Sequence, residues 1–141
     1  MKHPQTLAER LYQQFPTAKL KSIKEYACCA FTLMWCLGYE PEDAEAILTV
    51  GYMLDKGVID VDCTVYWEKA AQYLSGRKLK VEFKDSTTIK GIKDRSPVKY
   101  TYNGKSHWVG VENGRIKFNS LESSVCVSKG KPVTMRALKL A

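Results

Sequence analysis

The sequence lacks the marks of secreted, membrane-spanning and metal-binding proteins. No stretch approaches the roughly 18 apolar residues that a membrane span needs. Residues 1–15 hold no apolar core followed by a small-residue cleavage site, as a signal peptide would. The five cysteines are an odd number without Cys-x-x-Cys spacing, which argues against a disulfide framework and a zinc knuckle. We therefore expect a cytoplasmic protein with reduced thiols, no membrane contact, no metal and no other cofactor.

Proline, glycine and low-complexity tracts are also scarce. The 141 residues include 5 prolines and 9 glycines, and 45% are hydrophobic and 26% charged, which is typical of an ordinary globular protein. There is no internal repeat and no long linker. The length and composition predict a single domain over residues 1–141, with a helical half (1–75) and a β half (76–141).

Acidic residues are fewer than basic ones, which raises the question of a polyanionic partner. The chain has 22 basic and 15 acidic residues, a formal charge of +7. Clustered Lys and Arg would favour binding to phosphates. The densest basic stretch, residues 78–99, is interrupted by Glu82, Asp85 and Asp94. A solvated basic face explains this pattern better, so nucleic-acid binding is the last of the functions that we consider.

Hydrophobic spacing changes from a helical period to alternation near Ser75 and Gly76. The Asn-Gly pairs at 103–104 and 113–114 predict tight hairpin turns, because both residues tolerate positive φ angles. The fold class is therefore α+β, with a central cysteine-bearing helix packed on a C-terminal antiparallel sheet. The expected helices cover about 6–15, 27–37, 41–56 and 64–74, and the expected strands cover about 79–83, 98–102, 107–112, 115–118 and 132–138.

Two residue types in this pattern suggest thiol chemistry. Cys28 and Cys29 stand at the start of the most apolar helix, and His107 opens a strand in the other half. A helix N-terminus and a nearby imidazole both favour the reactive thiolate. His3, the only other histidine, lies in a terminus that we expect to fray. Cys28 is the candidate nucleophile, with Cys29 as the alternative, and His107 is the candidate base.

An imidazole base needs a group that orients it, and two neighbours qualify. A two-residue turn at 113–114 would pair His107 with Ser120 and align Val111 with Ile116. A three-residue turn would pair His107 with Asn119 instead. Packing favours the first register and the chemistry of ring orientation favours Asn119, so both stay open.

The start of the cysteine helix is open as well. Ser22 and Glu25 have the spacing of a capping box, and a helix beginning there would place Cys28 in its second turn, where the helix dipole has little effect. Trp108 and Trp35 are the candidate substrate-binding aromatic residues, although tryptophans more often fill a core or its rim.

The segments ACCAFTLMW and HWVGVENGRIKFNSLESS resemble the papain-like cysteine peptidase superfamily, in particular small bacterial and phage proteins related to the bacteriocin-processing peptidases. The resemblance covers roughly residues 20–138. It implies a papain-like fold with a catalytic Cys28 at the head of the central helix, His107 at a strand start and Asn119 in FNSL. It also implies hydrolysis of a peptide or amide bond, and a structural role for Cys63 in GVIDVDCTVYW.

Two departures from the family pattern leave a second function open. The family places a Gln several residues before the Cys to stabilise the oxyanion, but residues 17–27 contain none. The small residue that commonly follows the Cys is replaced by Cys29. The sequence thus predicts a cysteine peptidase or amidase that uses Cys28, His107 and Asn119, with a catalytically inactive papain-like binding module as the alternative and a nucleic-acid-binding protein as the second alternative.

Overall fold

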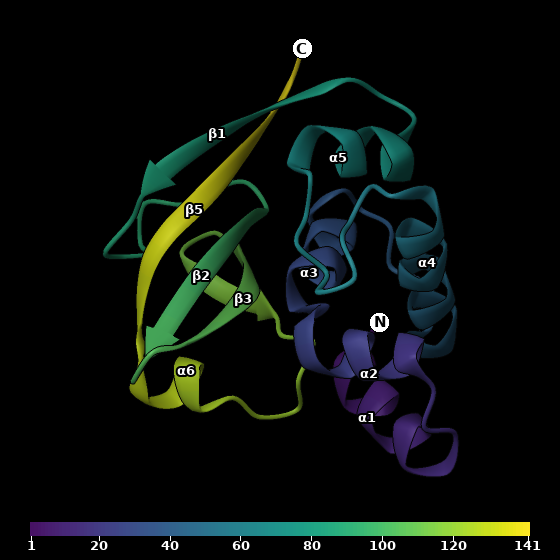
Figure 1. Cartoon of the computed structure of the whole chain (residues 1–141). Coiled ribbons are helices and arrows are strands. Elements are labelled where there is room, and N and C mark those ends of the chain that lie inside the picture. Colours follow the sequence, from purple (N-terminus) through teal and green to yellow (C-terminus); the bar gives the residue numbers. More distant parts are fainter.

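The helices of residues 4–75 gather on one side of the molecule, and the strands together with one short helix lie on the other, as Figure 1 shows for the computed structural model of residues 1–141. All strand pairs are antiparallel, and the structure confirms the α+β class. None of the helices combines the length and hydropathy that crossing a membrane requires. The helices are α1 (Pro4–Gln14), α2 (Ala18–Tyr26), α3 (Cys28–Cys36), α4 (Asp43–Lys56), α5 (Trp67–Ser75) and α6 (Val125–Lys129). The strands are β1 (Leu79–Asp85), β2 (Ser96–Tyr102), β3 (Lys105–Glu112), β4 (Arg115–Phe118) and β5 (Lys131–Leu140).

The sheet combines two hairpins with one long-range insertion. Its strand order is β1-β5-β2-β3-β4, so the last strand lies between the first two. The β2–β3 turn has positive φ angles at Asn103 (48°) and Gly104 (76°), and the β3–β4 turn has them at Asn113 (52°) and Gly114 (72°). Both Asn-Gly pairs therefore form the tight turns that the sequence predicts.

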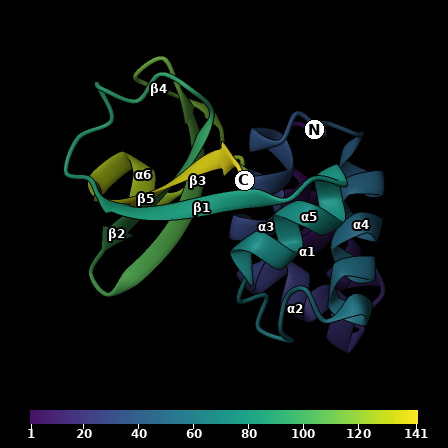
Figure 2. The same cartoon turned by 90° about the horizontal axis from the view of Figure 1, so that it is seen from above.

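Helix α3 is the centre of the molecule. It lies between α4 and the sheet in both views (Figures 1 and 2). Its residues Ala30, Phe31, Leu33 and Met34 have no exposed surface, since the helix is apolar on every side. It contacts the sheet at β3, where Gly110 leaves room for the ring of Trp35.

A second, smaller core lies on the other face of the sheet, away from α3. It consists of Ile92, Val98, Tyr100, Val109, Val111 and Cys126. Cys126 belongs to α6, a short helix that the sequence reading missed because five residues are too few to show a periodic pattern. Alternate residues of β3 therefore face different cores: Val109 and Val111 face the α6 side, and Trp108 and Gly110 face α3.

Helix α2 was not expected, and it settles where the cysteine helix begins. The Thr17 side chain caps α2 by accepting a hydrogen bond from the Leu20 N–H, so Ser22 lies inside the helix and caps nothing. Helix α2 ends at Tyr26, and α3 begins at Cys28 after the single junction residue Ala27. Five helices, and not four, precede the first strand, and Cys28 occupies the first turn of its own helix.

The remaining expected boundaries move by a few residues. Helix α1 begins at Pro4, α4 at Asp43 and α5 at Trp67, each two or three residues from the expected start. Strand β3 begins at Lys105, because the tight turn pairs Lys105 with Tyr102. His107 is therefore the third residue of its strand and does not open it.

Candidate active site

A groove of about 450 Å³ lies where the N-terminus of α3 meets β3 and the loop between α4 and α5. The loop is folded back on itself by a bridge between Ile59 and Val65. Cys28 lies in this groove, which is lined by Glu25, Tyr26, Cys28, Cys29, Asp62, Cys63, Thr64, Val65, Trp67, Ser106 and Trp108.

The start of α3 contacts β3 at Trp108, where the backbone edge of the strand is not paired with β4. Strand β4 ends at Phe118, which pairs with Gly110, so Trp108 has no strand partner on that side. The Thr32 hydroxyl lies 2.7 Å from the Cys28 carbonyl oxygen and 3.3 Å from the Trp108 carbonyl oxygen. The peptide N–H of Trp108 lowers the pKa of the Cys28 thiol. The start of α3 thus takes the place of a neighbouring strand, beside the residue that follows His107.

The thiols of the helix differ in access. Cys28 is partly exposed, while Cys29 is buried and belongs to the main core. Burial raises the pKa of Cys28, and the peptide N–H groups of Trp108 and Cys29 oppose this rise because they stabilise a thiolate. Burial raises the pKa of Cys29 well above its usual value. Both cysteines line the groove, and Cys28 is the more exposed of the two.

His107 and Asn119 are in direct contact. The His107 Nε2 atom lies 2.7 Å from the Asn119 side-chain oxygen. The same oxygen accepts the peptide N–H of Leu121 at 3.0 Å. Because a peptide N–H can only donate, this Asn119 atom is an acceptor, and Nε2 of His107 must carry the proton. The neutral ring then has its lone pair on Nδ1.

The His107 ring is held in this neutral form. It is buried, and burial lowers its pKa, while the hydrogen bond to Asn119 raises it by a smaller amount. The structure describes no hydrogen bond between the Cys28 sulfur and this ring. Catalytic hydrogen bonds in a protein without substrate are often long and tighten when substrate binds.

A bulge in the β3–β4 hairpin explains why Asn119, and not Ser120, contacts His107. The two-residue turn pairs Val111 with Ile116, as the first register predicts. One residue farther the register shifts, so Phe118 faces Gly110 and not Val109. The fully buried Ser120 donates to the Gln5 side-chain oxygen at 2.7 Å. Neither of the two predicted registers therefore holds along the whole strand. The bulge directs Asn119 to His107 and Ser120 to Gln5.

Two residues near the start of the chain support this loop, although the sequence analysis gave them no role. Gln5 receives the bond from Ser120 and donates its amide to the Lys24 carbonyl oxygen at 2.9 Å. The His3 ring lies 3.0 Å from the Asn119 carbonyl oxygen, so His3 is anchored and not frayed. No local pattern could have found the contacts of Gln5 with Ser120 and of His3 with Asn119, because more than 110 residues separate the partners.

The tryptophans divide between groove and core. Trp108 lines the groove, and its ring meets the Trp67 ring edge to face at 5.2 Å. Trp35 is buried, stacks on Phe118 at 6.0 Å and does not line the groove. The structure brings Cys28 and Trp108 into one groove and joins His107 to Asn119, but it leaves Trp35 in the core. It also brings Trp67 into the groove.

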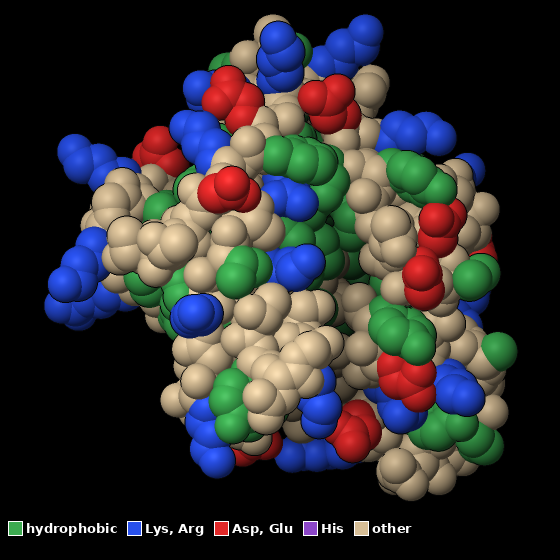
Figure 3. Space-filling model, turned by 60° about the vertical axis from the view of Figure 1, so that its left-hand side comes forward, with side chains coloured by type: hydrophobic (Ala, Val, Ile, Leu, Met, Phe, Trp, Pro, Cys, Tyr) green, Lys and Arg blue, Asp and Glu red, His purple; other side chains and the backbone are tan.

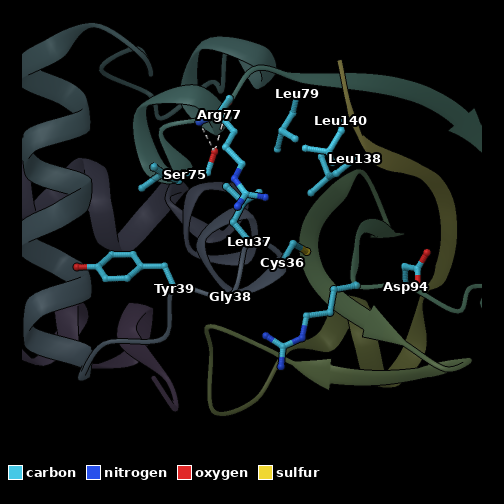
Figure 4. A pocket seen from close by; sticks show the side chains of 12 residues that line it. Cys36, Leu37, Gly38, Tyr39, Ser75, Arg77, Leu79, Asp94, Leu138 and Leu140 are labelled. Atoms are coloured by element: carbon cyan, nitrogen blue, oxygen red, sulfur yellow. Dashed lines mark hydrogen bonds between the residues drawn. The ribbon is translucent and has the colours of Figure 1, made fainter.

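Other pockets and clusters offer less chemistry. A larger pocket of about 730 Å³ lies at the opposite end of α3 (Figure 4). The thiol that it contains, Cys36, has a pKa raised by burial, and no histidine lines the pocket. No group of three or more His, Cys, Asp and Glu side chains is arranged to hold a metal ion.

Comparisons with known proteins add no relative: no family model, no curated protein and no solved structure matches the chain.

Proposed function

We propose that the protein is a cysteine hydrolase that cleaves a peptide or amide bond, with Cys28 as nucleophile, His107 as general base and Asn119 as the residue that orients the imidazole. The observation that carries the proposal is the hydrogen bond from His107 Nε2 to Asn119. It leaves Nδ1 as the acceptor on the ring. His107 is the residue before Trp108, whose carbonyl oxygen the Thr32 hydroxyl joins to the start of α3 at Cys28. A ring that is neutral and fixed in one tautomer is suited to accept a thiol proton.

The chemistry follows the usual course of acyl transfer. His107 Nδ1 accepts the Cys28 proton as the sulfur bonds to the substrate carbonyl carbon. Peptide N–H groups at the start of α3 stabilise the oxyanion that develops there. His107 then gives the proton to the leaving nitrogen, and the C–N bond breaks. Water, deprotonated by His107, attacks the thioester, which releases the acid and restores the Cys28 thiol.

A papain-like relationship is part of this proposal. The order of Cys28, His107 and Asn119 along the chain, a helix that begins with the cysteine and a sheet that carries the histidine all agree with it. The peptidase glutamine has no counterpart just before α3. Gln5 is not a replacement, because both ends of its amide are occupied by Lys24 and Ser120. The oxyanion therefore has to rely on peptide N–H groups.

A second candidate, a catalytically inactive binding module of the same fold, is favoured by one observation. Burial raises the pKa of Cys28, whereas an activated thiol has a lowered one. The two candidates differ in how His107 acts on Cys28. The rate at which a peptidyl probe alkylates Cys28, measured in the wild-type protein and in His107→Gln, separates the two candidates. In an enzyme this rate falls when His107 is replaced by Gln, and in a binding module it does not.

The decisive experiment is covalent labelling with a peptidyl chloromethyl ketone. We expect the wild-type protein and Cys29→Ala to be labelled at one site, and Cys28→Ala to remain unlabelled. Cys29→Ala is the matched control, since it removes the adjacent buried thiol and leaves the partly exposed thiol of Cys28. Equal labelling of the two variants would remove Cys28 from its proposed role.

A further inference from the structure

Arg136 is surrounded by aromatic rings. It lies on β5 opposite Phe83 of β1, on the same sheet face as Leu138, which packs against the main core. Its guanidinium carbon is 3.8 Å from the centre of the Phe83 ring, 5.0 Å from that of Trp108 and 5.3 Å from that of Trp67. Three rings therefore fix the plane of this cation.

No carboxylate neutralises Arg136. It takes part in none of the ion pairs of the protein. Its Nη1 donates to the Thr134 hydroxyl at 2.9 Å and to the Met135 carbonyl oxygen at 3.2 Å. Its Nε is buried without any partner, and its Nη2 makes no hydrogen bond. A buried donor without a partner is costly, and native structures seldom keep one without a reason.

The unoccupied donors form one edge of the guanidinium. Nε–H and an Nη2–H point the same way, and this fork matches the two oxygens of a carboxylate. Phe83, which covers the cation, is 66% exposed, so its ring can turn aside when a ligand arrives. The side chains that fix the plane of the cation therefore also leave one edge available for an anion.

The same cluster is continuous with the groove of Cys28. Trp67 and Trp108 line that groove together with Cys28, and the Thr32 hydroxyl joins the carbonyl oxygens of Trp108 and Cys28. The positive charge of Arg136 acts on the buried Cys29 thiol, the next residue along α3. Figure 3 shows a hollow in the surface where hydrophobic and basic side chains lie next to one another. A ligand lying across the tryptophans would reach both the thiol and the cation.

We propose that Arg136 is a specificity-determining residue that binds a carboxylate of the substrate through its Nε and Nη2 edge, so that the groove selects acidic peptides. The carboxylate is that of an Asp or Glu side chain, or of the chain terminus, within a few residues of the carbonyl that Cys28 attacks. That the bound peptide is a substrate rests on the hydrolase function proposed above. Binding of the carboxylate does not require catalysis.

The first test compares two ketone probes that differ only in Glu against Gln. We expect the Glu probe to label Cys28 at least about tenfold faster than the Gln probe, as a hydrogen bond between charged groups would give. Arg136→Gln should abolish the difference. Arg77→Gln is the matched control, because Arg77 also lacks an ion pair but lines the other pocket (Figure 4).

The second test measures binding without catalysis. In Cys28→Ala, acidic peptides and their Gln or Asn analogues are titrated by the fluorescence of the tryptophans beside Arg136. Peptides with a free or amidated C-terminus separate the two sources of the carboxylate. We expect tighter binding of at least one carboxylate-bearing peptide and loss of this preference in Arg136→Gln. Arg136→Lys keeps the charge without the fork, and it replaces Arg136→Gln if the latter fails to fold.

The outcomes distinguish the two proposals. Labelling of Cys28 without a preference for the Glu probe, together with equal affinities in the titration, would overturn the role of Arg136 and leave the hydrolase. A preference in the titration without any labelling of Cys28 would support the carboxylate site and contradict the hydrolase.

Discussion

Asn119 connects the candidate base to the backbone of its own loop. Its side-chain oxygen accepts from His107 at 2.7 Å and from the Leu121 N–H at 3.0 Å. The Leu121 bond fixes which end of the amide faces the ring, and the ring in turn presents Nδ1 as the acceptor. The chemical state of His107 therefore depends on a peptide N–H two residues beyond Asn119.

Replacing Asn119 with Ala should slow covalent labelling of Cys28 by about 10- to 100-fold, because a polar group that loses its partner costs about 1–3 kcal/mol. The measurement is the second-order rate constant with the peptidyl ketone. Ser120→Ala is the control, since Ser120 bonds to Gln5 and not to the ring. A rate that falls equally in both variants would point to a general loss of loop structure.

His107 makes stability depend on pH in a defined direction. Burial lowers its pKa in the folded state, so the unfolded chain binds a proton at a higher pH than the folded one. The unfolding free energy should be constant above about pH 6.5, the unperturbed value, and fall below it. Urea unfolding between about pH 7.5 and 5.5 avoids ordinary carboxyl titration. A fall that persists unchanged in His107→Gln would contradict this assignment.

Among the secondary-structure elements, the contact between α3 and β3 positions the groove. A side chain at Gly110 would drive its Cβ into the Trp35 ring, closer than real Cβ contacts come. Glycine at this point lets the helix approach the strand closely. The Thr32 hydroxyl then joins the two elements beside Cys28.

Gly110→Ala should lower the unfolding free energy by about 1–3 kcal/mol, because added volume in a packed core forces its neighbours to move. The midpoint of urea unfolding measures this. Gly91→Ala is the matched control, since a Cβ there meets no atom within 4 Å. Equal midpoints for the two variants would mean that Trp35 moves aside easily.

The elements that the sequence predicted well are those with local signals. The two Asn-Gly turns and the apolar run of α3 are set by residues next to one another, and the structure has both. Helix α2 was missed because its lysines hide the two apolar residues, Leu20 and Ile23, that face the core. The bulge between Gly110 and Val111 has no local signal, although it decides which side chain meets His107.

At the scale of the whole molecule, the helical half and the β half share one core. Trp108, Phe118 and Leu138 come from three strands and pack against the cluster formed by the helices. The chain enters the sheet at β1 and completes it only with β5, which lies beside β1. We therefore expect the two halves to fold as one unit.

Residues 1–75 and 76–141 produced separately should each fail to unfold cooperatively, because each exposes apolar surface that the other covers. Circular dichroism during urea titration measures this for each fragment and for their mixture. A cooperative transition in either isolated fragment would show that the halves are independent domains.

The sequence by itself determined the α+β class, the tight turns and the apolar cysteine helix, because each depends on residues close together in the chain. Only the tertiary structure decided that Asn119 meets His107, that Gln5 takes Ser120, and that Arg136 lies among aromatic rings without a carboxylate. These contacts join residues from separate elements, and a bulge or a strand insertion decides which of them meet. Local periodicity carries no record of such distant geometry.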